Sequence, residues 1–222
     1  MSDPQRPAVL VELLTRPESL SSGELGGRRR AGWFALALLA GAALYGVGAG
    51  FFAGGWQVLL AALKLPLVLA GALLVCLPSF VVIHLLAGVE LPLRRLLLAL
   101  AGLGALIGLL AAALMPIGWL FSVSSRSAGF LAFAHTVAWT VVALLGVRYL
   151  RVVLSSARGH AASVLWMVLL WMVALQLASW LGPVVHREAG QPAWDLRRGF
   201  FVARWLDPQA AEGPPVGPVE EP

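Results

Sequence analysis

Acidic residues are nearly missing from the middle of this 222-residue chain. It has eleven Asp and Glu residues in all, but Glu90 is the only one between Glu24 and Glu188. A soluble domain has about 25% charged residues, whereas this chain has 12% charged and 59% hydrophobic residues. So few charges could not cover the surface of a water-soluble fold of this size, whereas a lipid environment accounts for them. The composition therefore predicts an integral membrane protein.

Cysteine is represented by one residue, Cys76, which lies inside an apolar run and excludes an internal disulfide. We interpret Cys76 as a small buried hydrophobe, because a reactive thiolate requires an electropositive and accessible site. Cys76, His84 and His135 also lack the short His and Cys spacings of zinc sites, which use three or four ligands. The sequence therefore predicts neither a bound metal nor another cofactor.

Motifs of enzyme chemistry are missing as well. The chain has no G-x-x-x-x-G-K-[ST] phosphate-binding loop, and Ser79 follows Pro78 without the G-x-S-x-G turn of many serine hydrolases. No Asp or Glu lies inside any predicted membrane span, so the spans offer no carboxylate for acid–base catalysis. We therefore expect a protein that is not an enzyme.

Long apolar runs are what the chain does contain, and they predict an all-α fold, a polytopic transmembrane helical bundle of about five spans. Each run is long enough to cross the hydrocarbon core of a bilayer as a helix. The expected spans are residues 33–53, 65–86, 96–114, 130–147 and 164–181. We place an interfacial stretch at 56–64, and we end the third span at 114 because Pro116 disfavours helical geometry at the residue before it.

Polar segments flank this helical region at both ends. We divide the chain into a polar N-terminal tail at 1–31, a transmembrane helical domain at 32–184, and a polar C-terminal tail at 185–222. The first span is longer than the apolar part of a signal peptide, so we expect it to stay as a membrane anchor. Residues 199–206 are apolar but too short to cross the bilayer, and we interpret them as an interfacial segment.

Basic residues stand at the ends of the apolar runs, which is typical of orientation in a membrane and not of a nucleic-acid partner. A cytoplasmic N-terminus places ten arginines on the inner side: Arg6, Arg16, Arg28, Arg29, Arg30, Arg94, Arg95, Arg148, Arg151 and Arg158. Only Lys64 and Arg126 then lie in the outer loops. We therefore predict a multi-pass cell-membrane protein with a cytoplasmic N-terminus. Five spans leave the arginine-containing C-terminal tail outside, so the side of that tail stays open.

Small residues recur every four positions in two of the spans. The first span has Ala42, Gly46, Gly50 and Gly54, and the third has Gly104, Gly108 and Ala112. Helices in lipid associate through close backbone approach, so such stripes mark contact faces. We predict that Gly46 and Gly50 contact Gly104 and Gly108 of the third span, with a second protomer as the alternative. On this prediction Ala37 and Phe51 point away from the contact.

Polar side chains inside a span are functional candidates because their burial in lipid is unfavourable. Lys64, His135 and Gln176 are the residues that could line a polar path. A histidine hydrogen-bonded between helices is nevertheless commoner than a proton relay, which needs a carboxylate or a second histidine within reach. We expect His84 to lie at headgroup level, because it is close to the inner end of its span.

The segments Lys64-Leu-Pro66, Cys76-Leu-Pro-Ser79 and Leu85-Leu-Ala-Gly88 resemble a pattern in uncharacterised multi-pass bacterial inner-membrane proteins of similar length. The span count and size are also loosely similar to those of the Yip-type family of five-span membrane proteins. Neither resemblance implies an activity. We expect a non-enzymatic membrane scaffold, adaptor or accessory subunit that contacts the lipid bilayer and a membrane-protein partner or further copies of itself. The alternative is a small oligomeric channel or transporter.

Overall fold

Five helices make up the part of the chain that the structure, a computed structural model, describes: residues 27–51, 55–90, 92–124, 128–154 and 159–180. The helices are α2 (Gly27–Gly50), α3 (Gln57–Leu86), α4 (Leu93–Ser124), α5 (Ala128–Leu154) and α6 (Gly159–Trp180). All five are long and apolar enough to cross a membrane. The predicted all-α bundle of five spans is therefore confirmed, and the chain is a multi-pass membrane protein. Residues 1–26 of the N-terminal tail, the whole C-terminal tail with its segment 199–206, and Gly54 lie outside the described residues.

Three helix boundaries differ most from the predicted ones. The helix α3 begins at Gln57, so the interfacial stretch expected at 56–64 is instead almost entirely helical. The helix α4 continues through Pro116 to Ser124, beyond the predicted end at 114, and α5 continues through the segment expected as a loop after Val147 to Leu154. Proline is tolerated inside a membrane helix when neighbouring groups satisfy the carbonyl that it frees. Long arginine side chains likewise let a helix continue past the hydrocarbon core.

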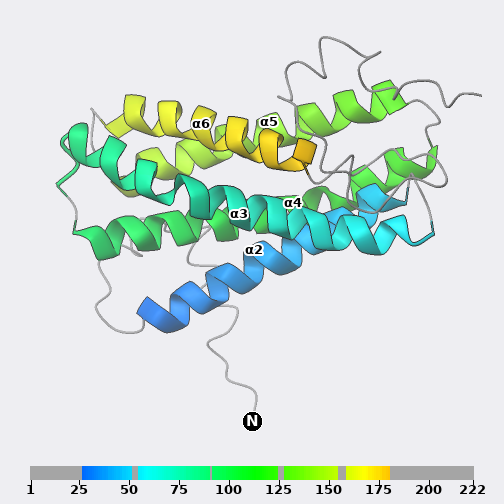
Figure 1. Ribbon diagram of the computed structural model, residues 1–222, viewed down its shortest axis with the longest axis horizontal. Helices are drawn as coiled ribbons and strands as arrows, with labels where there is room; N and C mark the ends of the chain where they lie inside the picture. Colours follow the sequence, from blue (N-terminus) through cyan, green and yellow to red (C-terminus); the bar gives the residue numbers. More distant parts are fainter. Residues whose placement is uncertain (1–26, 52–54, 91, 125–127, 155–158, 181–222) are drawn as a thin grey trace, which may run out of the picture.

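Successive helices alternate in direction and lie side by side along the long axis of the molecule (Figure 1). The helices α2 and α4 run parallel, because Gly41 lies against Gly108 and Gly48 lies against Met115. The helices α3 and α6 run antiparallel, since Trp166 bonds to Cys76 while Ser163, nearer the start of α6, bonds to His84, nearer the end of α3. The starts of α2, α4 and α6 therefore share one end of the bundle with the ends of α3 and α5. We call this the arginine end, because Arg30, Arg94, Arg95, Arg148 and Arg151 lie there.

The helix α2 contacts α4 through one glycine face. A Cβ atom on Gly41 would overlap the backbone carbonyl of Gly108, and a Cβ atom on Gly108 would overlap the backbone of Ala37 and Leu38. Further along, a Cβ atom on Gly48 would lie 3.1 Å from the carbonyl oxygen of Met115. Only glycine allows two backbones to approach so closely, so these positions fix the α2–α4 crossing.

A second glycine face of α2 contacts α3. A Cβ atom on Gly46 would lie 2.5 Å from the carbonyl oxygen of Ala61, and one on Gly50 would lie 2.7 Å from the Cα atom of Val58. Gly46 and Gly50 therefore pack against the second span, not against the third span as predicted. The reason is that α2 lies between two neighbours and uses a different glycine face for each.

Of the other residues that the prediction named, Ala37 and Gly104 also differ from it. Ala37, which we expected to point away from the contact, lies in the α2–α4 interface beside Gly108. A Cβ atom on Gly104 would contact only side chains, at 3.3 Å from a methyl carbon of Leu73 and 3.4 Å from one of Leu38. Phe51, by contrast, is exposed. Ala42 is buried, and Ala112 borders a shallow groove beside the α2–α4 contact.

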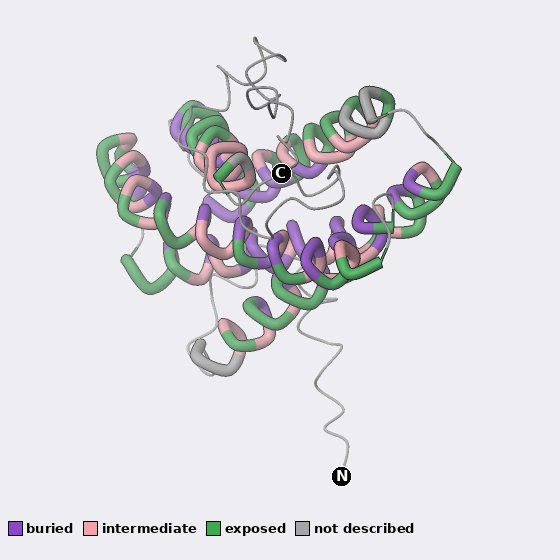
Figure 2. Tube along the Cα trace, turned by 45° about the vertical axis from the view of Figure 1, so that its right-hand side comes forward, coloured by how far each residue is buried: buried purple, intermediate pink, exposed green. Residues whose placement is uncertain are grey.

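The hydrophobic core contains residues from all five helices, with Phe34 and Leu38 contributed by α2. Figure 2 shows buried residues on the inward faces of the helices and exposed residues on the outer faces. Large apolar side chains such as Leu74 and Leu144 lie on those outer faces, where they suit a lipid environment. The largest fully buried side chains are Trp166, Phe34, Phe80, Leu96, Leu103 and Leu150.

The α2–α4 contact leads to a stability prediction. We expect Gly108→Ala to lower the free energy of unfolding by about 1–3 kcal/mol, because the added methyl group forces two backbones apart. Reversible unfolding in mixed detergent micelles measures this change. Gly104→Ala is the matched control on the same helix, since its added methyl group meets only side-chain methyl groups that can move. Equal losses in the two variants would contradict the proposed contact.

Candidate functional site

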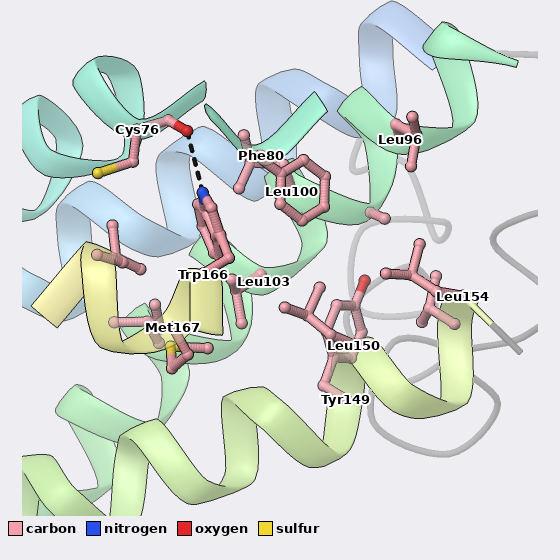
Figure 3. Packing of buried hydrophobic residues seen from close by; sticks show 14 of the residues in the cluster. Cys76, Phe80, Leu96, Leu100, Leu103, Tyr149, Leu150, Leu154, Trp166 and Met167 are labelled. Atoms are coloured by element: carbon pink, nitrogen blue, oxygen red, sulfur yellow. Dashed lines mark hydrogen bonds between the residues drawn. The ribbon is translucent and has the colours of Figure 1, made fainter. Parts of the chain in front are cut away.

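Trp166 on α6 makes a hydrogen bond to the backbone of α3. Its Nε1 donates to the carbonyl oxygen of Cys76 at 3.0 Å (Figure 3). Ser79 Oγ donates to the same oxygen at 2.8 Å. Both bonds lie in the stretch around Pro78, which has no N–H to donate to the helix. The Phe80 ring packs edge-to-face against Trp166 with centroids 4.7 Å apart. The carbonyl that loses its helical partner to Pro78 is that of Leu74, four residues earlier, so these contacts join α3 to α6 close to the proline without replacing the bond that it removes.

His84 forms a second link between α3 and α6, close to the arginine end. It is fully buried, so its expected position at headgroup level is wrong. Its Nδ1 donates to the carbonyl oxygen of Phe80 at 2.7 Å, and its Nε2 lies 3.3 Å from Ser163 Oγ. Ser163 Oγ is in turn 2.7 Å from the carbonyl oxygen of Gly159, to which it donates. The imidazole ring is therefore held inside the protein, where lipid headgroups do not reach it.

The protons available to this group limit which bonds form together. A neutral imidazole has one ring proton, which the carbonyl of Phe80 requires on Nδ1. The single hydroxyl proton of Ser163 can then be donated either to Nε2 of His84 or to the carbonyl of Gly159. All three bonds form at once only with a doubly protonated ring. The pair joins the last turn of α3 to the first turns of α6 when Ser163 donates to Nε2 or when Nε2 itself carries a proton.

A third polar pair lies towards the opposite end of the bundle. Tyr45 Oη on α2 and His135 Nδ1 on α5 are 2.7 Å apart. The Tyr45 ring stands edge-on to the rings of His135 and Trp139, with centroids 5.6 and 5.5 Å apart. A Cβ atom on Gly118 of α4 would lie 3.5 Å from the Tyr45 ring, an ordinary contact distance, so α4 borders this pair. His135 Nε2 is buried and has no hydrogen-bond partner among the residues that the structure describes.

A pocket of about 480 Å³ opens beside this pair. Its walls come mainly from α3, α5 and α6, and α2 and α4 contribute Tyr45, Ala49 and Ile107. Most lining residues are alanine, leucine, valine or methionine, and none of them is charged. The lining side chains that carry polar atoms are those of Tyr45, His135, Thr136, Trp139 and Trp171. The arrangement suits a largely apolar molecule with few polar atoms.

The three residues predicted to line a polar path are not brought together. His135 is in the pocket wall, whereas Lys64 and Gln176 are not among its lining residues. Lys64 is 4% exposed, and both Lys64 and Gln176 interact with other groups. Sequence reasoning did not single out Tyr45, Trp166 or Ser163. The one available signal was that Tyr45 is one of only two tyrosines in the chain and lies inside an apolar run.

Comparison of the chain with protein-family models, with curated proteins and with solved structures found no match. The resemblances suggested by the short sequence segments therefore stay predictions.

The bond between Trp166 and Cys76 can be tested by substitution. We expect Trp166→Phe to lower the free energy of unfolding by about 0.5–2 kcal/mol, because it removes a buried donor and part of the packing against Phe80. Reversible unfolding in mixed micelles is again the measurement. Trp180→Phe is the control, since Trp180 on the same helix is 48% exposed. The interpretation would be wrong if the control were as destabilising as Trp166→Phe.

Proposed function

We propose that this protein is a non-enzymatic membrane scaffold, adaptor or accessory subunit that works through helix packing and its tails. The observation that supports this most is how the polar groups inside the spans are used. Trp166 and His84 bond across α3 and α6, and the Tyr45–His135 pair bonds across α2 and α5. Polar side chains that join helices specify one arrangement of a bundle in lipid. This use of polar groups is that of a structural component.

An oligomeric channel or transporter is the second candidate, because His135 does border a pocket within the membrane-spanning region. A conducting path needs several polar or charged groups along its length. Lys64 and Gln176 do not line this pocket, and no charged residue does. The scaffold is therefore the better-supported function.

We also propose that the arginine end faces the cytoplasm of a bacterial cell, with the protein in the inner membrane. The alternating helices bring Arg30, Arg94, Arg95, Arg148 and Arg151 to this end of the bundle. Arginine accumulates on the cytoplasmic side of membrane proteins. This placement supports a cytoplasmic N-terminus.

Reconstitution in liposomes distinguishes the two functions. We expect vesicles that contain the purified protein to release protons and potassium ions no faster than protein-free vesicles, because the pocket has no charged lining. Fluorescent indicators inside the vesicles measure both fluxes. A flux that is present in the wild-type protein and abolished by His135→Ala would overturn the scaffold proposal in favour of a channel.

Cysteine labelling tests the orientation. In a Cys76→Ser background, we expect Gln57→Cys to react with a membrane-impermeant maleimide added outside spheroplasts, because Gln57 begins α3 at the end opposite the arginines. Leu93→Cys, at the exposed start of α4, should react only after lysis. The reverse pattern would show that the orientation is inverted.

A further inference from the structure

Two buried side-chain polar atoms among the described residues have no hydrogen-bond partner, His135 Nε2 and Tyr149 Oη. Only His135 belongs to the wall of the 480 Å³ pocket. A buried polar atom without a partner is unfavourable, because it has lost its hydrogen bonds to water. The structure therefore contains an unmet hydrogen bond beside a space large enough for a small molecule.

The direction of the Tyr45–His135 hydrogen bond determines whether His135 Nε2 lacks an acceptor or a donor. Tyr45 can donate its hydroxyl proton to Nδ1, which places the single ring proton of a neutral imidazole on Nε2. The reverse arrangement, with Nδ1 donating to Tyr45, would leave both the tyrosine proton and Nε2 without partners. The first arrangement leaves one unmet group and is favoured for that reason. Nε2 is then a donor, and the missing partner is a hydrogen-bond acceptor.

The pocket lining restricts the acceptor further. A phosphate or an ammonium headgroup would have no charged partner there, since no lining residue is charged. Aromatic side chains of Tyr45, Trp139 and Trp171 contribute to the lining, and such surfaces pack well against a flat ring. The pocket is built from membrane-spanning helices, so its ligand can arrive from the lipid.

We propose that this pocket binds a neutral, membrane-soluble molecule of the quinone class, with one ring carbonyl accepting a hydrogen bond from His135 Nε2. Nε2 is buried in the structure, so a neighbouring group has to move as the ligand enters. The leucine and methionine side chains of the lining can change rotamer for this purpose. The inference goes beyond the scaffold function and does not depend on it.

Binding can be measured on the full-length protein in phosphatidylcholine nanodiscs with a tritiated short-chain alkyl benzoquinone and scintillation proximity. Empty nanodiscs correct for partition of the probe into lipid. We expect saturable binding that Ala174→Phe weakens by more than about tenfold, because the added ring fills the pocket. Val168→Phe is the matched control on α6, since Val168 is 57% exposed and outside the pocket, and its affinity should equal that of the wild type.

His135→Ala should weaken binding by about 3- to 10-fold, the effect of losing one neutral hydrogen bond. Should His135→Ala fail to fold, Tyr45→Phe replaces it: without the tyrosine hydroxyl the ring proton is free to move to Nδ1, and binding should weaken as well. An alkylbenzene of the same chain length tests recognition of the carbonyl. We expect it to compete poorly with the benzoquinone, because it offers no acceptor to Nε2.

Four results would overturn the proposal. Binding that is no greater than in empty nanodiscs would remove it, and equal weakening by Val168→Phe and Ala174→Phe would indicate a general effect on the bundle. Equal competition by the alkylbenzene would show that the carbonyl is not recognised. Native mass spectrometry could also find a phospholipid that Ala174→Phe removes and the benzoquinone does not displace, which would assign the pocket to a phospholipid. None of these outcomes affects the liposome test of the scaffold function.

Discussion

Close backbone contact of α2 with α3 and α4 is the constraint on which the rest of the bundle depends. Lipid tails are as apolar as leucine, so water does not drive these helices together inside the bilayer. Contact must instead come from dispersion between closely fitting surfaces. Gly41 and Gly108 on one side of α2, and Gly46 and Gly50 on the other, remove the side chains that would hold the backbones apart. The interior then leaves no room for a methyl group at these crossings.

Once α2 is fixed, the polar groups of the spans have defined partners. Tyr45 on α2 faces α5 and bonds to His135, and the contact with Gly118 shows that α4 also borders this site. Trp166 and His84 connect α6 to α3 at two separate levels. Each bond joins residues far apart in the sequence, so together they select one arrangement of helices whose apolar faces are otherwise similar. The α2 helix is held by close backbone contact with α3 and α4. Hydrogen bonds between side chains and their partners join α5 to α2 and α6 to α3.

The five spans could be predicted from the sequence because length and hydrophobicity are local properties. The partners of each glycine could not. A four-residue spacing identifies a face on one helix, but it does not show which neighbour covers that face, and the Gly41–Gly48 contact with α4 follows a seven-residue spacing instead. The predicted end of the third span at 114 was wrong for a related reason, since the effect of Pro116 on a helix in lipid depends on groups from other helices. The pairing of Tyr45 with His135 depends on helix order in space, which no local pattern contains.

The helix α5 is held differently at its two ends, and this explains where the pocket lies. Near the arginine end, Tyr149, Leu150, Val153 and Leu154 are buried in the core. Towards the other end, Phe133, Val137 and Val141 are exposed, and the Tyr45–His135 bond is the hydrogen bond described between this half of α5 and α2. The pocket lies along this second half, where His135, Trp139 and Ala143 of α5 contribute to its lining. The glycine contacts of α2 are not part of that lining, so the closest helix crossings and the space for a small molecule lie in different parts of the bundle.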